Sequence, residues 1–203
     1  MDDYSWLRIP AADVDRAARE LLGWRLTAHG VTVRLTEVEA YSGLGRDPAS
    51  HAHRGMTGRN EVMFGPAGML YVYQIYGMHF CANVVCGEPG VAAAVLLRAG
   101  EVVEGLETAR ARRPAARRDR DLAAGPAKLM QSLALDRRAN ATSVVDGTGP
   151  ATLTAPERPV PAEGVVAGPR VGVTAAHDIP WRFWIAGDPT VSAYRRHTAR
   201  VRR

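Results

Sequence analysis

One long stretch of strand-forming sequence constrains the fold of this chain more than any other feature. Residues 62–99 read VMFGPAGMLYVYQIYGMHFCANVVCGEPGVAAAVLLRA, in which β-branched, aromatic and other apolar residues dominate. The segments GPAG, YGMH and GEPG interrupt this run with residues that favour turns. Short strands separated by such turns predict a meander of antiparallel strands, with a hairpin at IYGMHF.

A second strand is predicted upstream of the meander, over residues 31–41 (VTVRLTEVEAY). Successive side chains of a strand point to opposite faces, so strict alternation would place Val31, Leu35, Glu37 and Glu39 on one face. That face would change from aliphatic to acidic along its length.

The other elements follow from helical spacing and turn chemistry. Apolar spacing and capping residues predict helices over residues 13–23, 101–113 and 125–135. Residues 42–60 are predicted to be a loop, residues 146–169 to be mostly loop, and residues 170–176 and 181–187 to be short strands. Strands followed by helices indicate an α+β fold. We therefore expect a single α+β domain over residues 1–203, with helices around an antiparallel sheet.

The chain is basic, with a formal net charge of +5 and a pI near 9.7. A polyanionic partner fits this charge, because neutralised phosphates release counterions. Lys128 is the sole lysine, and the arginines concentrate at residues 110–120 and in the tail, residues 194–203. Each cluster is either a solvated face or a set of phosphate contacts.

The cysteine content and the N-terminal sequence predict a cytoplasmic protein. The two cysteines, Cys81 and Cys86, lie within apolar sequence, as buried free thiols do in a reducing compartment. The N-terminal MDDYSWLRIP lacks the basic and apolar regions of a signal peptide, and the sequence has no apolar run long enough to span a membrane.

Glu39 is the most informative candidate for chemistry, because an ionised carboxylate among apolar neighbours needs a partner. It is either half of a structural ion pair or a catalytic base in a partly dry pocket. Arg98 ends an apolar strand and is predicted to meet these acids. It would balance their charge, orient a water molecule, or do both.

Histidines and tyrosines supply further candidates. Tyr41, His51 and Tyr73 would form an aromatic slot for a flat cationic base. Tyr76, at the predicted hairpin tip, suits a wedge that separates stacked bases. A metal site built from Glu37, Glu39, His51 and His53 is an alternative, although its spacing matches no metal-binding signature.

Four segments of the chain resemble the alkyladenine DNA glycosylase family. They are EVEAY at residues 37–41, SHAHRGMTGRNEVMFGPAGMLYVYQIYGMHFCANVV at residues 50–85, VLLRAGEVVEGLETAR at residues 95–110 and GPAKL at residues 125–129. The resemblance implies that the sheet is curved and that the hairpin protrudes from it.

The same resemblance implies roles for individual residues of the site. Glu39 matches the general base for the attacking water, which Arg98 and the backbone carbonyl of Val171 help to hold. Tyr41, His51 and Tyr73 match residues that stack around a flipped base. This leaves the polar contacts to the base and to the DNA for other positions.

The resemblance assigns those contacts as well. Asn83 matches a position that disfavours guanine, and Tyr76 matches the intercalating residue. Lys128 matches a phosphate contact, and the remaining DNA contacts implied are Met63, His79 and Arg59.

The predicted function is therefore that of a monofunctional DNA glycosylase that flips alkylated or deaminated purines from duplex DNA and hydrolyses the N-glycosidic bond, initiating base excision repair. We expect no cofactor, no metal, a monomer and association with the nucleoid. A metal-dependent hydrolase and a non-catalytic damage-binding protein are the competing predictions.

Overall fold

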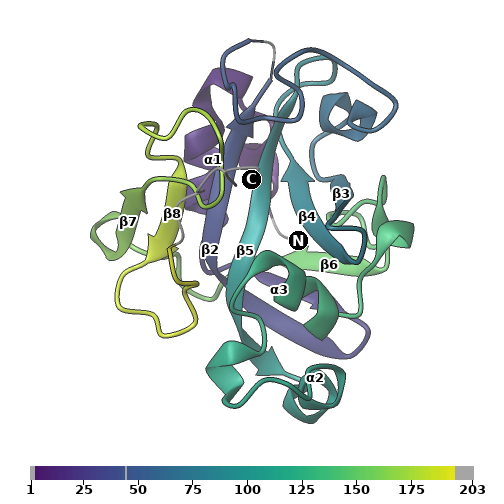
Figure 1. Cartoon of the computed structure of the whole chain (residues 1–203), viewed down its shortest axis with the longest axis vertical. Coiled ribbons are helices and arrows are strands. Elements are labelled where there is room, and N and C mark those ends of the chain that lie inside the picture. Colours follow the sequence, from purple (N-terminus) through teal and green to yellow (C-terminus); the bar gives the residue numbers. More distant parts are fainter. Residues whose placement is uncertain (1–2, 44, 195–203) are drawn as a thin grey trace, which may run out of the picture.

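The computed structural model describes residues 3–43 and 45–194. Within these residues the strands form one antiparallel sheet in the order β3-β4-β5-β2-β1-β6, and β8 pairs with both β2 and β7 (Figure 1). The strands are β1 (Arg25–Ala28), β2 (Val31–Ser42), β3 (Leu70–Ile75), β4 (His79–Val85), β5 (Ala93–Glu104), β6 (Ala151–Thr154), β7 (Val165–Gly168) and β8 (Arg182–Ile185). The helices are α1 (Val14–Glu20), α2 (Leu106–Arg112) and α3 (Pro126–Ser132). The predicted α+β class is confirmed.

Strands β2 and β5 form the centre of the sheet and bend where their register shifts. Leu35 pairs with Gly100, Glu37 with Ala99 and Val38 with Leu97. Thr36 is therefore an extra residue on β2, and an equivalent extra residue follows on β5. Such bulges increase the local bend and twist of a strand.

This shift corrects the predicted faces of β2. Val33 and Leu35 enter the main hydrophobic cluster, but beyond the bulge it is Val38 that enters it. Glu37 and Glu39 therefore lie on the opposite face from the one that uninterrupted alternation predicts. One inserted residue reverses the inward and outward positions of everything that follows.

The bend requires a glycine on β5. A Cβ atom on Gly100 would lie 2.3 Å from Val33 Cγ1 and 2.4 Å from the carbonyl oxygen of Arg34. Because real Cβ atoms do not approach so closely, a larger side chain would force the two strands apart. Gly100 therefore allows β2 and β5 to stay in contact where their register changes.

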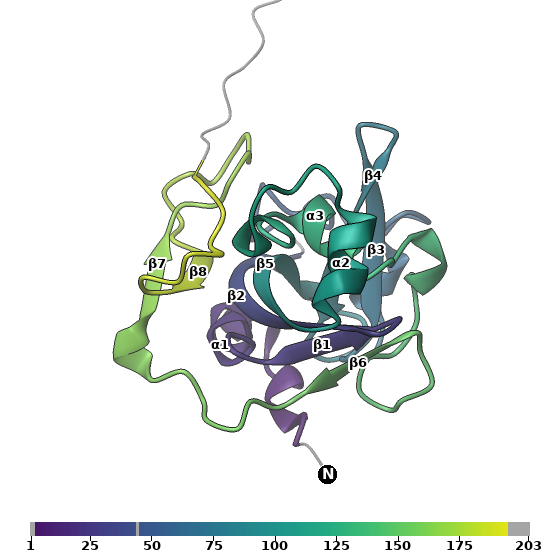
Figure 2. The ribbon, with the colours of Figure 1, turned by 90° about the horizontal axis from the view of Figure 1, so that it is seen from below.

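The predicted hairpin is confirmed, and it projects from the body of the molecule (Figure 2). Tyr76 and Gly77 both adopt positive φ angles, of 51° and 70°, in the turn. The side chains at the tip face solvent: Tyr76 is 88% exposed and Met78 is 68% exposed. Large apolar side chains at such a tip are available for an external partner.

The other predicted elements are partly confirmed. The three predicted helices appear as α1, α2 and α3, each shorter than predicted, and residues 101–104 belong to β5. Strand β8 falls within predicted residues 181–187, and described residues 43 and 45–60 form the predicted loop.

One prediction near the C-terminal end holds in part, and another was wrong. Residues 146–169, predicted to be mostly loop, also contain strands β6 and β7, which pair with β1 and β8. Residues 170–176 form no strand, because Gly172 and Ala176 adopt positive φ angles and the Val171 amide bonds a side chain. The arginine-rich tail was predicted over residues 194–203, of which 195–203 lie outside the described residues.

The core lies between the sheet and the helices. Helices α1 and α3 contribute Val14, Ala17, Leu129 and Met130 to the main cluster. Both cysteines are buried and free, as predicted. Within the described residues, no helix has the length and apolar character needed to cross a membrane.

Candidate active site

A cavity of about 510 Å³ opens where β2 and β5 meet the hairpin and the loops after β2 and β7. Such a volume falls within the range of small-molecule sites. Its walls include most of the predicted site residues: Glu39, Tyr41, His51, Met63, Tyr73, Tyr76, Asn83, Arg98 and Val171. The fold thus brings together residues that are up to 132 positions apart.

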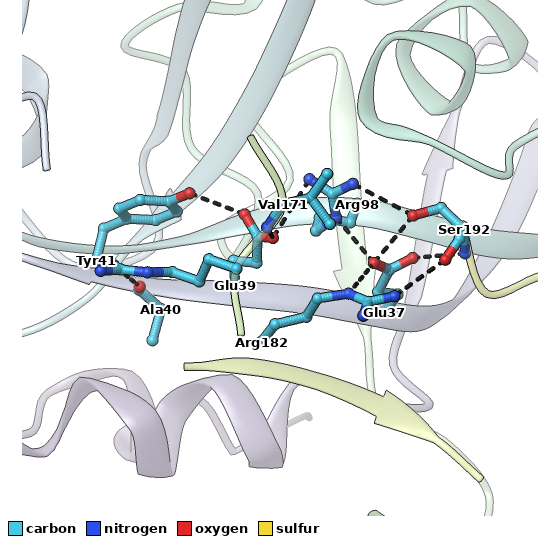
Figure 3. A network of polar contacts seen from close by, with 9 residues as sticks. Glu37, Glu39, Ala40, Tyr41, Arg98, Val171, Arg182 and Ser192 are labelled. Carbon is cyan, nitrogen blue, oxygen red and sulfur yellow. Dashed lines mark hydrogen bonds and ion pairs between the residues drawn. The ribbon is translucent and has the colours of Figure 1, made fainter. Parts of the chain in front are cut away.

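The Glu39 carboxylate is fully buried and is held by donors from three segments (Figure 3). The Val171 amide donates to Oε1 over 2.7 Å, and the Tyr41 hydroxyl donates to Oε2 over 2.8 Å. Arg98 Nη1 lies 3.4 Å from Oε1. The resemblance assigns the Val171 carbonyl to the attacking water, whereas here its amide positions Glu39.

A second buried carboxylate, Glu37, anchors two arginines beside the site (Figure 3). Its Oε1 accepts from Arg98 Nε over 2.8 Å and from Arg182 Nε over 2.6 Å. The Ser192 amide donates to Oε2 over 2.7 Å. Burial raises the pKa of Glu37, but the charges and hydrogen bonds of Arg98, Arg182 and Ser192 outweigh it and hold the pKa below its ordinary value.

Glu37 therefore stays ionised near neutral pH, as a counterion for both guanidinium groups. The prediction that Arg98 meets the acids of the neighbouring strand is confirmed. The contributions of Arg182 and Ser192 were not predicted. No local pattern marks them, because they join Glu37 across 145 and 155 positions of sequence.

Aromatic rings form one wall of the cavity. The His51 and Tyr73 ring centroids lie 4.7 Å apart at 83°, and His51 Nδ1 lies 3.0 Å from the Tyr71 hydroxyl. Burial, with a contribution from the charge of Arg59, lowers the pKa of His51. Burial also raises the pKa of Tyr41 and of Tyr73, and the charge of Glu39 adds to both shifts. These rings are therefore neutral near pH 7.

The floor of the cavity is polar at one place. Asn83 is 3% exposed and donates from Nδ2 to the Tyr71 carbonyl over 3.2 Å. Cys81 lies beside it on β4, and burial raises the pKa of its thiol to about 11. The thiol is therefore protonated near neutral pH and is a poor nucleophile.

An ion pair that sequence reasoning missed joins the two loops at the cavity. Arg170 binds Asp47 through two contacts of 2.6 and 2.7 Å, and both side chains are fully buried. The guanidinium carbon lies 4.7 Å from the centroid of the Tyr41 ring, and Nη1 donates to the Ala40 carbonyl. A charged residue next to Val171 in RVGV was the available signal.

Three predicted DNA contacts do not line the cavity. His79 lies next to the hairpin tip, opposite Ile75 in the last strand pair before the turn, and Lys128 is exposed in the first turn of α3. Arg59 is exposed near His51 and Tyr71. Their roles on DNA stay predictions.

The alternative metal site is not assembled in the described part of the chain. No group of three or more His, Cys, Asp and Glu side chains there is arranged to hold a metal ion. Glu37 instead binds arginines and Ser192, and His51 contacts Tyr71. The buried Nδ1 of His53 has no hydrogen-bond partner among the described residues.

Known proteins share this sequence over most of its length. A family model described as methylpurine-DNA glycosylase matches residues 9–189. A Nocardia farcinica protein is 53% identical over 188 residues, covering 91% of this chain and 88% of its own. A Streptomyces avermitilis protein is 53% identical over 200 residues, covering 96% and 92%. A Mycobacterium tuberculosis protein is 45% identical over 190 residues, covering 92% of each.

All three relatives carry the name 3-methyladenine DNA glycosylase. The family match spans the strands that carry Glu39, Tyr73, Asn83 and Arg98, together with the loop of Val171. The predicted family is confirmed. The chain therefore belongs to the methylpurine-DNA glycosylase family, and it is a DNA glycosylase.

Proposed function

We propose that this enzyme is monofunctional: it extrudes an alkylated purine nucleotide from duplex DNA and hydrolyses its N-glycosidic bond with water, without cutting the strand. The observation that carries this proposal is a buried carboxylate, Glu39, at the wall of an aromatic cavity. The enzyme acts as a monomer in the cytoplasm, on the DNA of the nucleoid. Its initial product is an abasic site.

Extrusion depends on the hairpin and the cavity together. The exposed Tyr76 would fill the gap that the departing nucleotide leaves in the stack, at an unstacking cost of a few kcal/mol. Tyr41, His51 and Tyr73 would then enclose the base. Alkylation at N3 or N7 makes a purine cationic, and a cation is attracted to the faces of neutral aromatic rings.

Hydrolysis then requires a water molecule at C1′ of the sugar. Glu39 would accept the proton of that water while its charge stabilises the oxocarbenium-like sugar. As the new C–O bond forms, the C1′–N bond breaks and its electron pair leaves with the cationic base, which departs neutral. Arg98, with Nη1 3.4 Å from Glu39, would help to hold the water.

The substrate class follows from this chemistry and from the relatives. A cationic 3-methyladenine fits both the aromatic wall and the leaving-group requirement, and it is the substrate that the relatives' names state. Asn83, which lines the cavity, would contact an exocyclic group of the purine. Deaminated purines such as hypoxanthine would be slower substrates, because a neutral base leaves less readily.

The lysine content supports the proposed absence of strand cleavage. A lyase needs an amine that attacks C1′ to give a Schiff base. Lys128 is the sole lysine in the sequence, and its exposed position on α3 suits a phosphate contact. The nearest groups to Glu39 are a hydroxyl, an amide and a guanidinium, none of which forms a Schiff base with a sugar.

The test uses duplex DNA methylated with dimethyl sulfate, incubated with the wild-type enzyme in the presence of EDTA. We expect free methylpurines, intact strands until alkali is added, and no adduct after borohydride reduction. A borohydride-trapped adduct would contradict the monofunctional mechanism. Tight lesion binding without base release would instead favour a damage-binding protein. Loss of activity in EDTA would favour a metal-dependent hydrolase.

A further inference from the structure

Two carboxylates and two guanidinium groups meet on the face of β2 and β5 that borders the cavity. Glu37 and Glu39 come from β2, Arg98 comes from β5 and Arg182 comes from β8. All four are at most 6% exposed. Only Glu39 and Arg98 line the cavity, so the other two lie behind it.

The donors of Arg98 are divided unequally between the two carboxylates. Nε binds Glu37 over 2.8 Å, and Nη2 binds the Ser192 hydroxyl over 3.2 Å. That hydroxyl in turn donates to Glu37 over 3.0 Å. Only Nη1 faces Glu39, at 3.4 Å, which is too long for a strong charge-assisted hydrogen bond.

This division matters for the chemistry proposed for Glu39. A guanidinium that donates two hydrogen bonds to a carboxylate stabilises its ionised form strongly, above all in a buried site. A carboxylate stabilised in that way accepts a proton less readily and is a weaker general base. If Arg98 could rotate and donate two hydrogen bonds to Glu39, it would therefore weaken Glu39 as a general base.

We propose that Glu37 is a positioning residue that holds Arg98 away from a full ion pair with Glu39 and so preserves the ability of Glu39 to accept a proton from water. Glu37 also provides the negative charge that offsets Arg182, which lies opposite Glu39 in the β2–β8 register. The inference rests on the proposed function of Glu39. It explains why a chain needs two adjacent buried acids for a reaction that uses one base.

The other charged and titratable groups around Glu39 do not provide this counterion. Tyr41, Tyr73 and Cys81 are neutral near pH 7, because burial raises the pKa of each. His51, in the same cavity, has a lowered pKa. Among residues 3–43 and 45–194, the remaining group is Arg170, whose charge is matched by Asp47. Glu37 is thus the carboxylate that balances Arg98 and Arg182.

The first test is the pH dependence of single-turnover base release by Glu37→Gln. The substrate is duplex DNA that contains 7-methylguanine, whose base is already cationic and needs no added proton. The acidic limb of the pH–rate profile, where the rate falls as the pH decreases, therefore reports the protonation of the general base. We expect a limb shifted to lower pH and a plateau rate reduced about tenfold, consistent with a weaker base.

Two further variants separate positioning from structural damage. Glu101→Gln neutralises a half-exposed carboxylate elsewhere on β5, and we expect both limb and plateau to match the wild type. In Arg182→Gln, Glu37 keeps Arg98 as its guanidinium partner, and a positive charge near Glu39 is lost. The acidic limb of the pH–rate profile of this variant should therefore move to higher pH. Should Glu37→Gln fail to fold, an Arg182→Gln limb at or below the wild-type position would overturn the proposal.

A measurement on free protein separates this inference from the proposed function. The ¹³C resonance of the Glu39 carboxylate, identified by its loss in Glu39→Gln, is titrated in the wild type and in Glu37→Gln. We expect a lower Glu39 pKa in Glu37→Gln, whether or not the wild type releases base. An unchanged Glu39 pKa, or a folded Glu37→Gln with the wild-type limb and plateau, would overturn the role of Glu37. A wild type without base release would overturn the proposed function alone.

Discussion

Arg170 and Asp47 form a buried ion pair that fixes two loops to one another beside the active site. Both side chains are fully buried, and Asp47 also accepts from the Ser42 and Ala49 amides. Removing one partner of such a pair leaves a buried charge without compensation. We expect Asp47→Asn to lower the free energy of unfolding by about 3–5 kcal/mol, measured by urea denaturation.

Glu101→Gln is the matched control for this substitution. It breaks a contact between Arg34 and Glu101 whose side chains are 29% and 49% exposed. Partly exposed pairs of this kind contribute about 1 kcal/mol or less, because water competes for both charges. Equal losses of stability for Asp47→Asn and Glu101→Gln would show that the buried pair does not hold the loops.

Single residues differ in how well the sequence predicted them. Glu39 and Arg98 could be selected because charged residues stand out in apolar strands, and the resemblance supplied roles for both. Glu37, Arg182 and Ser192 were not predicted to form one network, because their proximity depends on β8 and the following turn docking on β2. Such convergence leaves no trace in local sequence.

The β3–β4 hairpin carries a tyrosine in a backbone conformation that side chains other than glycine rarely adopt. Tyr76 has a φ angle of 51°, which costs roughly 1 kcal/mol for a residue with a Cβ atom. The Tyr76 side chain has little contact with the rest of the protein, because it is 88% exposed. The strained backbone at Tyr76 is therefore consistent with a side chain that serves to contact another molecule rather than to stabilise the fold.

We expect Tyr76→Gly to leave the melting temperature unchanged or slightly higher and to reduce base release from duplex DNA about tenfold at low enzyme concentration. The reason is that glycine relieves the strain but removes the wedge that stabilises an extruded nucleotide. Tyr76→Phe, which keeps the ring, should retain activity. Wild-type activity of Tyr76→Gly on duplex DNA would contradict the wedge.

The sequence predicted helices and strands well where turn residues mark their ends. It predicted them poorly where pairing with a distant strand defines the element or its faces. The IYGMHF hairpin and strand β2 were identified from turn chemistry and alternation, but the faces of β2 beyond Thr36 were reversed by a bulge. Strands β6 and β7 lie in sequence rich in proline, glycine and alanine, and only their pairing with β1 and β8 defines them.

The charge of the chain is divided between internal pairs and groups free to meet phosphates. Arg110 and Arg118, from the arginine-rich residues 110–120, bind Asp119 and Asp121, so part of this cluster is compensated within the fold. Lys128 is exposed at the start of α3, whose Pro126 borders the cavity. We therefore predict that Lys128, rather than Arg110 or Arg118, contacts a phosphate.

The dependence of DNA binding on salt tests this assignment. For Lys128→Gln we expect the plot of the logarithm of the DNA association constant against log salt to become less steep, its negative slope decreasing in magnitude by about one, because one fewer counterion is released. Arg138→Gln is the control, since Arg138 is held by Asp136 over 2.8 Å and should leave the slope unchanged. A Lys128→Gln slope equal to that of the wild type would exclude the contact.

The most direct measurement compares wild type with Glu39→Gln on methylated duplex DNA under single-turnover conditions. Glu39→Gln keeps the size of the side chain and an oxygen for the Val171 amide, but it cannot accept a proton from water. We predict DNA binding within about twofold of the wild type and base release at least about a hundredfold slower. Base release by a folded Glu39→Gln at the wild-type rate would contradict the assignment of Glu39 as the general base.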